Sequence, residues 1–353
     1  MPQKGNHLIG SQASYRPANT SSDALVTVII LNWNGRRFLE PCLLSLRRQT
    51  LMGVGVLIVD NGSTDGSVEF VGQRFPEVRV IHSDTNLGFA AGNNLAIRQA
   101  RSDYVALLNN DTEADPRWIE ELVSGLDRHP EISFCASKML LYGDRECADA
   151  CGDFYTMEGM AGKIGHRLPA SQYTEPVEVF GACAGAAMYR RKMLEDVGLF
   201  DEDFYLIHED TDLNVRARLL GHRCLFVPTA IVYHRLNATV GTLTNQAVYL
   251  GSRNIEYVYV KNMPASLVFK YGALHVVVGC LLFFRFLARG KGWPFLKGKL
   301  AVFAAFRQLL QKRGRIQGGR RVKDAEFESL LTRGWLQRGV RHWLQRRGAA
   351  PAS

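Results

Sequence analysis

Three apolar runs of the sequence end at side chains that can bind a ligand. These are Asn32 after the run 25–31, Asp60 after the run 55–59, and Asn109, Asn110 and Asp111 in "LLNNDT" after the run 104–108. Carboxylate and amide oxygens bind divalent cations and form hydrogen bonds with nucleotides. Asn and Asp are also common in turns, because their side chains bond nearby backbone groups. The residue types alone leave a ligand site and a plain turn as alternatives.

The elements that precede these side chains predict an α/β fold. The apolar runs, together with 78–81, are typical of strands that are buried on both faces, and helical patterns at 39–46 and 94–100 separate them. Strand and helix alternating in this way indicate a mainly parallel sheet flanked by helices. The carboxyl ends of parallel strands lie at one edge of a sheet, so we expect the three polar clusters to face one crevice.

The glycine-rich signatures of nucleotide binding are missing from this chain. No GxGxxG follows the first strand and no GxxxxGK[ST] occurs anywhere in the sequence. A nucleotide would therefore be held by side chains. Asp60 can accept a hydrogen bond from a base or ribose, Asn32 can pair with a base edge, and Asp111 can hold a cation that bridges two phosphates.

A second group of acids lies in "DVGLFDEDFYLIHEDTDLNVRARLLGH" at 196–222. One interpretation is the start of a helix, where the helix dipole favours acidic side chains and an apolar helical pattern follows. The other is a catalytic site, because a carboxylate can remove a proton from an attacking hydroxyl group. The composition of the segment is compatible with both.

Four segments, in order and spacing, resemble family 2 inverting glycosyltransferases with the GT-A fold, in particular the bacterial rhamnosyltransferase-like branch. They are "VTVIILNWNGRRFLEPCLLSL", "LIVDNGSTDGS", "NLGFAAGNN" and "YVALLNNDT", and the resemblance extends from about residue 25 to about residue 260. It implies a sugar donor that is a nucleotide diphosphate sugar and a Mg²⁺ or Mn²⁺ cofactor.

The resemblance also implies roles for individual residues. The donor-binding set is Asn32, Asn34, Asp60, Asn61, Gly88, Asn93, Asn109 and Asn110. The metal ligands are Asp111 and, at the end of a later strand, His234. Asp111 is the only carboxylate of its motif, which departs from an acid-x-acid pair. The loop and helix start around Gly88 are expected to present N–H groups to phosphate or sugar hydroxyls.

On the acceptor side, the resemblance places the general base in His208-Glu209-Asp210. We assign Asp210 as the base and Glu209 as the second candidate, with Gly185, His208 and Asp212 at the acceptor site. Asp212 is expected to cap or orient. Inversion requires one carboxylate that deprotonates the acceptor hydroxyl as this attacks the anomeric carbon opposite the leaving group.

Charge is distributed unevenly along the chain. The whole chain carries +9, whereas residues 285–353 hold 17 Lys and Arg against 3 acids, a net of +14. A basic tail indicates an anionic surface, and no nucleic-acid-binding motif is present. The apolar stretch 271–284 has about 14 residues, fewer than the ~20 that a span requires. We expect peripheral attachment to anionic lipid on the cytoplasmic face of the plasma (inner) membrane; the alternative is a helical bundle packed on the catalytic domain.

The predicted organisation has four parts. They are a flexible leader 1–23, a nucleotide-sugar-binding half 24–120, an acceptor-binding half 121–252 and a basic helical membrane-associating tail 253–353. The leader lacks a signal-peptide pattern, and seven scattered cysteines do not suggest a disulfide framework.

The expected activity is transfer of a sugar, with L-rhamnose from dTDP-rhamnose as the preferred donor, to a polyprenyl-diphosphate-linked or cell-surface glycan. One alternative is a processive polysaccharide synthase, but the Gln-x-x-Arg-Trp motif and the several spans typical of such enzymes are missing from the sequence. The other is an inactive nucleotide-sugar- or glycan-binding module, although Asp60, Asp111 and Asp210 are all retained.

Overall fold

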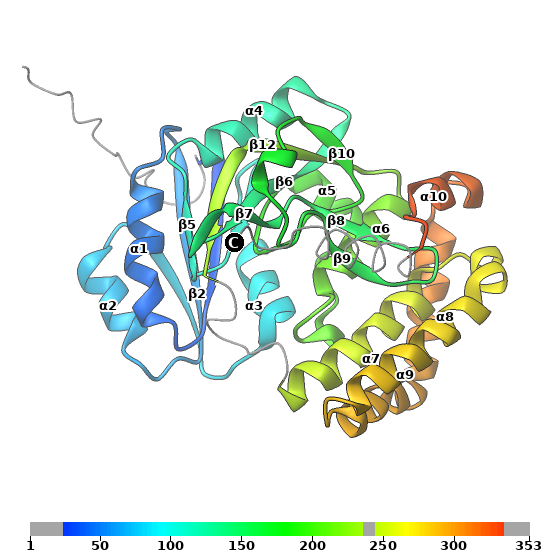
Figure 1. Cartoon of the computed structure of the whole chain (residues 1–353). Helices are drawn as coiled ribbons and strands as arrows, with labels where there is room; N and C mark the ends of the chain where they lie inside the picture. The colour runs from blue at the N-terminus through cyan, green and yellow to red at the C-terminus, as the bar shows by residue number, and fades with distance from the viewer. Residues whose placement is uncertain (1–23, 236–243, 335–353) are drawn as a thin grey trace, which may run out of the picture.

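The structure is a computed structural model, and it describes residues 24–235 and 244–334. A ten-stranded sheet with helices on both faces forms the body of the molecule (Figure 1). Its strands are β1 (Val26–Asn32), β2 (Val54–Asn61), β3 (Arg79–Ser83), β4 (Tyr104–Leu108), β5 (Thr112–Ala114), β6 (Ile132–Leu141), β7 (Asp144–Ala150), β10 (Val177–Val179), β11 (Ala186–Arg190) and β12 (Arg223–His234). A separate pair consists of β8 (Asp153–Tyr155) and β9 (Ala161–Lys163).

The helices flank this sheet or follow it in the chain. They are α1 (Arg36–Arg47), α2 (Ser67–Arg74), α3 (Gly88–Ile97), α4 (Trp118–Arg128), α5 (Arg191–Val197), α6 (Glu209–Leu219), α7 (Asn245–Asn262), α8 (Ala265–Leu287), α9 (Gly292–Gly319) and α10 (Asp324–Leu330).

The strand order is β10-β12-β6-β11-β4-β1-β2-β3. Strands β3, β2, β1 and β4 are parallel to one another, and β6 and β12 are also parallel. Strand β11 runs antiparallel between β4 and β6 and joins the two parallel groups. The predicted α/β fold with a mainly parallel sheet flanked by helices is confirmed.

Strand β1 shows why the apolar runs form central strands. Val28 and Ile30 are buried in the core on one face of the sheet, beneath α1 and α4, whereas Ile29 is buried in the core on the other face, against α3 and α5. A strand covered on both faces is largely apolar. The polar residues of β1 are Thr27, whose hydroxyl accepts a hydrogen bond from Ser102, and Asn32 at the carboxyl end, which is in register with Asp60 of β2.

A third core joins the C-terminal helices to the catalytic body. Phe204 and Val215 belong to the same buried cluster as Val258 of α7, Val302 of α9 and Phe327 of α10. Helix α7 runs across the boundary that we expected between residues 252 and 253. The C-terminal helices are therefore part of the folded body and do not form a separate appendage.

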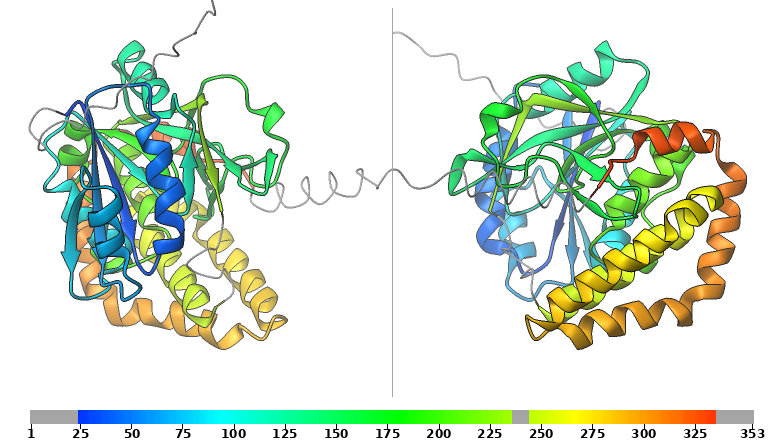
Figure 2. Two further views of the ribbon diagram at one scale, coloured as in Figure 1. Left: turned by 90° about the vertical axis from the view of Figure 1, so that its left-hand side faces the viewer. Right: turned by 45° about the vertical axis from the view of Figure 1, so that its right-hand side comes forward.

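Helix α8 is longer than the apolar stretch that the sequence suggested. It has 23 residues, Ala265–Leu287, because the segments on both sides of 271–284 are also helical. Among the described residues, α8 is the one helix that by length and composition could cross a membrane. In the right-hand view of Figure 2, α9 runs along the bottom of the molecule and then up its right-hand side, and α8 runs diagonally upward from the bottom.

Candidate active site

The strand ends form one connected polar network. Asn110 Nδ2 donates to Asn32 Oδ1 over 2.8 Å, and Asn32 Nδ2 lies 3.5 Å from Asp60 Oδ1 and 3.2 Å from Ser63 Oγ. On the other side of Asp60, Oδ2 lies 3.0 Å from His82 Nδ1. Asn32, Asp60 and Asn110 are buried. The structure thus brings the three predicted residues together and adds His82, which is in register with Asp60.

Asn34 connects the turn after β1 to the turn after β2. Its Oδ1 accepts from the backbone N–H of Thr64 over 2.8 Å, and its own N–H donates to Ser63 Oγ over 2.9 Å. Asn34 has φ of 49°, in the left-handed region that Asn tolerates better than most residues. Next to it, a Cβ on Gly35 would lie 2.1 Å from Asn110 Nδ2, so only glycine allows the two strand ends to approach.

The start of α3 differs from our expectation. The N–H groups of Phe89 and Ala90 both donate to the carbonyl oxygen of Tyr205, and the N–H of Gly88 donates to Asn86 Oδ1. These groups are therefore already bonded and do not point to a phosphate. A Cβ on Gly88 would lie 2.4 Å from the Tyr205 ring, so this glycine allows the loop that precedes α6 to dock on α3.

The two other asparagines predicted to bind the donor have structural contacts. Asn61 donates to Asn86 Oδ1 and to the carbonyl of Gly88, so it holds the loop before α3 against β2. Asn93 is buried and donates to the carbonyl of Phe89 within its own helix. These contacts stabilise the donor side of the site without requiring a ligand.

Asp111 and His234 face each other, as a shared cation would require. His234 Nε2 lies 3.3 Å from Asp111 Oδ1, and both side chains are buried. The pairing of β12 with β5 brings them together, because His234 is in register with Thr112, the residue after Asp111. The other ring nitrogen, Nδ1, lies 2.8 Å from Asp149 Oδ2.

Asp149 was not predicted, and it lies at the centre of a charged cluster. It is fully buried on β7, and besides His234 it contacts Lys163 Nζ at 2.9 Å and His166 Nδ1 at 3.1 Å. Burial raises the pKa of Asp149, but hydrogen bonds from His166 and His234 and the charge of Lys163 outweigh burial and hold this pKa well below its usual range. Asp149 is therefore a carboxylate at neutral pH.

The same contacts act on His234 in the opposite direction. Burial lowers the pKa of His234, but its hydrogen bonds with Asp111 and Asp149 outweigh burial and raise this pKa to about 9. Without a cation, the surroundings of the imidazole thus favour its protonated form, and a cation at Nε2 would have to displace that proton. A carboxylate and an imidazole are a donor pair that suits Mn²⁺, and Mg²⁺ prefers the carboxylate.

The residues present fit a divalent cation whose coordination shell is completed by a bound ligand. Within residues 24–235 and 244–334, no group of three or more His, Cys, Asp or Glu side chains is arranged to hold an ion by itself. Asp111 and His234 would supply two ligands of such a cation, and the remaining positions would belong to water and to donor phosphates.

The loop before α6 is held in a strained conformation. Tyr205, Ile207 and His208 have φ values of 61°, 71° and 68°. Backbone strain of this kind persists where the surrounding structure imposes it, and it is common at functional sites. Here the support comes from α7, because Asn254 Nδ2 donates to the carbonyl oxygens of Phe204, Leu206 and Ile207.

The two candidates for the base at the start of α6 have different environments. Asp210 is half-buried, and its carboxylate accepts from the N–H of Ala184 at 3.4 Å and of Thr211 at 2.7 Å. Glu209 is buried, and its Oε2 has no hydrogen-bond partner among the described residues. Burial, together with the charge of Asp210, raises the pKa of Glu209 well above its usual value. Asp210 is therefore the better placed candidate for the base, because two backbone N–H groups orient its carboxylate.

Gly185 connects the two halves of the site. Its carbonyl accepts from the N–H of Asn109 over 2.9 Å, and a Cβ at this position would lie 3.0 Å from Asn109 Nδ2. The preceding residue, Ala184, donates to Asp210. The loop before β11 therefore places Asp210 next to the strand end that carries Asn109 and Asp111.

Asp212 and His208 complete the predicted set. Asp212 is fully buried, with Arg216 Nε at 2.8 Å and Lys261 Nζ at 2.8 Å, so its oxygens are engaged in ion pairs that tie α6 to α7. This structural role replaces the acceptor contact that we expected. His208 is half-buried with Thr211 Oγ1 at 3.4 Å, and burial lowers the pKa of His208 to about 4. It is therefore neutral at physiological pH.

Comparison with known proteins agrees with this geometry. The family model "Glycosyl transferase family 2" matches residues 27–198, which include the strand ends and the loop that carries Gly185. The chain belongs to glycosyltransferase family 2. Its match to the family model ends before α6, the helix that carries Asp210.

Curated relatives of this family 2 glycosyltransferase include two from Mycobacterium tuberculosis. One is N-acetylglucosaminyl-diphospho-decaprenol L-rhamnosyltransferase, 27% identical over 242 residues that cover 61% of this chain and 78% of the relative. The other is pre-mycofactocin glycosyltransferase, 29% identical over 266 residues that cover 73% of this chain and 53% of the relative.

Solved structures confirm the GT-A fold of this family 2 glycosyltransferase. The mannosyltransferase PcManGT of Pyrobaculum calidifontis, in complex with GDP-Man and Mn²⁺, superimposes with a TM-score of 0.51 and 16% identity over 87% of this chain and 84% of that chain. GalNAc-T7 with UDP, GalNAc and Mn²⁺ gives a TM-score of 0.55 and 16% identity over 68% of this chain and 48% of its own.

Proposed function

We propose that this enzyme transfers L-rhamnose from dTDP-rhamnose, with inversion, to a polyprenyl-diphosphate-linked glycan at the cytoplasmic face of the inner membrane. The observation that carries the transfer chemistry is the arrangement of Asp111 and Asp210 on either side of the Asn109–Gly185 contact. A cation-binding carboxylate and a base thus belong to one crevice. The sugar and the acceptor class are inferred from the rhamnosyltransferase of M. tuberculosis, which is named for a decaprenol-linked substrate.

In this proposal the nucleoside occupies the network at the ends of β1 and β2. Asp60 and Asn32 can exchange their contacts with each other and with His82 for hydrogen bonds to the base or sugar. The glycines at 62 and 66, both with positive φ, shape the turn that follows β2 so that the backbone passes close to the ligand.

Asp111 and His234 hold a divalent cation in the proposed ternary complex. When bound, Mg²⁺ or Mn²⁺ supplies positive charge that stabilises the departing nucleoside diphosphate. Asp149 keeps His234 Nε2 directed at Asp111 by its contact with Nδ1. Lys163 pairs with Asp149, so its ammonium group lies on the side of Asp149 and His234 that faces away from Asp111.

Asp210 removes the proton of the acceptor hydroxyl as the oxygen attacks the anomeric carbon. The N–H groups of Ala184 and Thr211 orient its carboxylate. Glu209 is buried, and burial raises its pKa, whereas the carboxylate of Asp210 is the one that the two N–H groups orient. The proton passes to Asp210, the new glycosidic bond forms on one face of the sugar, and the bond to the diphosphate breaks on the opposite face.

The described residues favour a single transfer over processive synthesis. One helix, α8, meets the length and composition of a span. Asp60, Asp111 and Asp210 all lie at the crevice with their surroundings formed, which favours an active enzyme over a binding module.

The test is transfer from radiolabelled dTDP-rhamnose to a synthetic polyprenyl-diphosphate N-acetylglucosamine, with Mn²⁺ or Mg²⁺ and in EDTA. UDP-glucose and GDP-mannose serve as competing donors. We expect transfer from dTDP-rhamnose that requires the cation. Asp210→Asn should lower kcat by about 10²–10⁴-fold while donor affinity, measured by calorimetry, stays unchanged, because the base acts on the acceptor.

Three results would contradict this proposal. Preference for another donor would refute the sugar, and full activity in EDTA would refute the cation. A larger loss in Glu209→Gln than in Asp210→Asn would reverse the assignment of the base.

A further inference from the structure

Helices α8 and α9 expose large apolar side chains to solvent. The exposed fraction is 94% for Phe269, 77% for Phe303 and 68% for Trp293. Others on the same two helices are exposed to a smaller degree, namely Leu274, Val276, Val277, Leu281, Phe284, Leu287, Leu296, Leu300, Phe306 and Leu310. Large apolar side chains exposed in this number on two consecutive helices indicate an interaction site.

Helix α8 passes the length test for a span, but it is bonded to the protein along its length. Near its start, Lys270 Nζ contacts Glu328 of α10 at 2.7 Å. At its middle, His275 Nδ1 lies 2.7 Å from the carbonyl oxygen of Glu158, and its ring stacks on Tyr259 at 3.9 Å. At its end, Phe286 stacks on Phe295 of α9. A transmembrane orientation would break all these contacts.

Helix α9 is attached in the same one-sided way. Ser252 Oγ of α7 donates to the carbonyl of Phe295 over 3.0 Å, and Arg313 Nη1 donates to the carbonyl of Val260 over 2.7 Å. Lys312 Nζ forms an ion pair with Asp203 at 2.6 Å. Val302 and Leu309 of α9 are buried with α7, so the exposed apolar residues of α9 occupy its other side.

Basic residues share that exposed side of α9. Lys297 and Arg307 are four and fourteen residues after Trp293, and Arg315 is eight residues after Arg307, so a period of 3.6 residues places them on one side with Trp293 and Leu300. All three basic side chains are exposed, and Lys297 Nζ also lies 5.8 Å from the ring centre of Tyr249 on α7. Apolar and basic groups on one face are complementary to a bilayer of anionic lipid, where acyl chains lie beneath phosphates.

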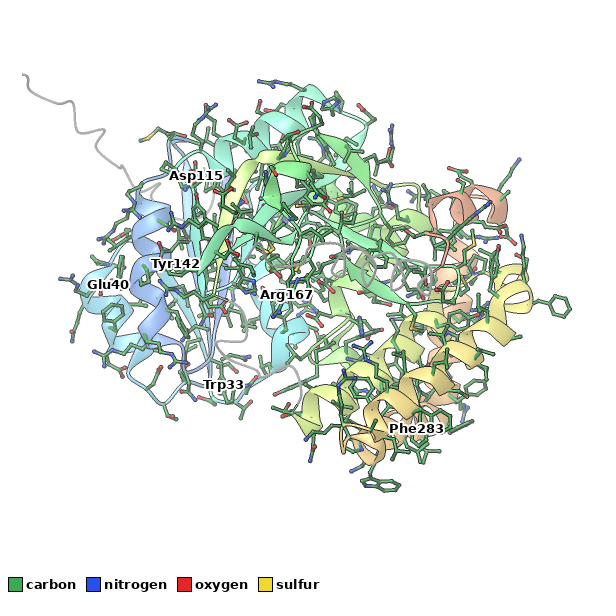
Figure 3. All side chains as sticks on the ribbon, viewed as in Figure 1. Trp33, Glu40, Asp115, Tyr142, Arg167 and Phe283 are labelled. Carbon is green, nitrogen blue, oxygen red and sulfur yellow. The ribbon has the colours of Figure 1, made fainter. Side chains whose placement is uncertain are left out.

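The apolar faces are on the same side of the molecule as the donor crevice. Trp33, which directly follows Asn32 at the end of β1, and Phe283 of α8 both lie in the lower part of the view in Figure 3. Figure 2 shows that the end of α8 and the beginning of α9 meet at this lower side, from which both helices then run upward. A membrane that contacts the junction of α8 and α9 therefore lies on the side to which the strand ends point.

We propose that α8 and α9 insert side by side into the interface of an anionic bilayer, in its plane and without crossing it, and hold the crevice at the membrane surface. Phe269, Trp293 and Phe303 enter the acyl region, and Lys297, Arg307 and Arg315 contact lipid phosphates. The role of this contact in capturing a lipid-linked acceptor rests on the proposed function. The membrane contact itself does not depend on that function.

The first experiment measures flotation of the full chain with phosphatidylglycerol or phosphatidylcholine vesicles, without donor or acceptor. We expect flotation with the anionic vesicles, weakened by salt. Replacing the three basic residues (Lys297→Gln, Arg307→Gln, Arg315→Gln) should lower the partition coefficient about 100-fold. Phe269→Ser with Phe303→Ser should lower it about as much. Met52→Ser with Val177→Ser, two exposed apolar residues elsewhere, is the matched control and should have no effect.

The second experiment measures depth. Cys280 is exposed, three turns after Phe269 on the apolar side of α8, and it can carry a nitroxide label. Labels at Cys280, and separately at positions 269 and 287 in a Cys280→Ser chain, should report similar shallow depths. A label near the bilayer centre at position 280 with shallow labels at both other positions would establish a span and overturn the in-plane arrangement.

Two further outcomes would also overturn this proposal. Absence of flotation with anionic vesicles, combined with dimers in sedimentation velocity that Phe303→Ser dissolves, would assign the surface to a second copy of the chain. If the variant that lacks the three basic residues floated as well as the native chain, the proposed contacts with lipid phosphates would be wrong. Failure of rhamnosyl transfer leaves the flotation result unaffected, so the two hypotheses fail separately.

Discussion

At the residue scale, the site contains two carboxylates that act through a neighbour rather than on a substrate. Asp149 contacts His234, and Asp212 contacts Lys261 and Arg216. Both are buried, and ion pairs hold the pKa of each below its usual range although burial raises it. A buried charge that loses its partner is costly, so substitutions here affect both structure and function.

Asp149→Asn should weaken Mn²⁺ binding about 10–100-fold, because an amide fixes the orientation of His234 less firmly and withdraws negative charge from it. The measurement is free Mn²⁺ by electron paramagnetic resonance, in the presence of a nucleoside diphosphate. Asp149→Asn combined with Lys163→Met removes both charges of one buried pair and serves as the control for stability. If Mn²⁺ affinity were unchanged in folded Asp149→Asn, this positioning role would be wrong.

At the element scale, one half-buried acid connects three helices. Glu256 of α7 contacts His275 of α8 at 2.9 Å and also pairs with Lys299 of α9. Burial raises the pKa of Glu256, but His275 and Lys299 outweigh burial and lower it to about 2. These contacts fix the angle at which α8 and α9 leave the body, and hence the orientation of the apolar faces.

The sign of the pH dependence follows from that lowered value. The pKa of Glu256 is lower in the folded chain than in the unfolded chain, so its contribution is complete above about pH 4.5 and is lost as the pH falls towards 2. Glu256→Gln should therefore cost about 3 kcal/mol of unfolding free energy at pH 7. The difference in unfolding free energy between Glu256→Gln and the native chain should become smaller below pH 4.5.

Urea unfolding followed by circular dichroism at pH 7, 5, 4 and 3 measures this difference. Glu146→Gln, at an exposed acid on β7, is the control and should have little effect at any of these values. A gap between Glu256→Gln and the native chain that stayed constant from pH 7 to pH 3 would contradict the assigned ion pairs.

At the scale of the whole molecule, the catalytic body and the C-terminal helices share one core. Phe204 and Phe180, from the acceptor half, pack in the same cluster as Ile255, Val258 and Phe327. Arg253 and Asn254 also bond the carbonyl groups of the loop before α6. The helices that present the apolar surface therefore also support the loop that leads into Asp210.

A chain that ends at residue 252 should fail to form a soluble folded protein, because it exposes one side of this third core and removes the support of the strained loop. A chain that ends at residue 334 keeps every member of that core and should unfold in one cooperative transition. Circular dichroism and thermal unfolding compare the two. A stable, cooperatively folded chain 1–252 would show that the boundary predicted from the sequence is a real domain boundary.

The sequence by itself determined the parallel half of the sheet and the donor network. Both are properties of local pattern: a strand covered on both faces is largely apolar until its end, and the ends of parallel strands meet at one edge. Asn32, Asp60 and Asn110 could therefore be predicted as neighbours. The pairing of Asp111 with His234 came from resemblance to a family. His82 was within reach of the pattern, because it follows the strand predicted at 78–81.

Only the tertiary structure decided the contacts between distant segments. Asp149 and His234 are 85 residues apart, and nothing in the composition of "CADACGD" indicates that β7 turns this carboxylate towards the end of β12. The start of α3 looked like an anion site because local sequence cannot show that Tyr205 supplies the acceptor for its N–H groups. The pairing of buried charges and the bonding of helix ends depend on which surfaces meet in space, and those surfaces are set by packing of the whole chain.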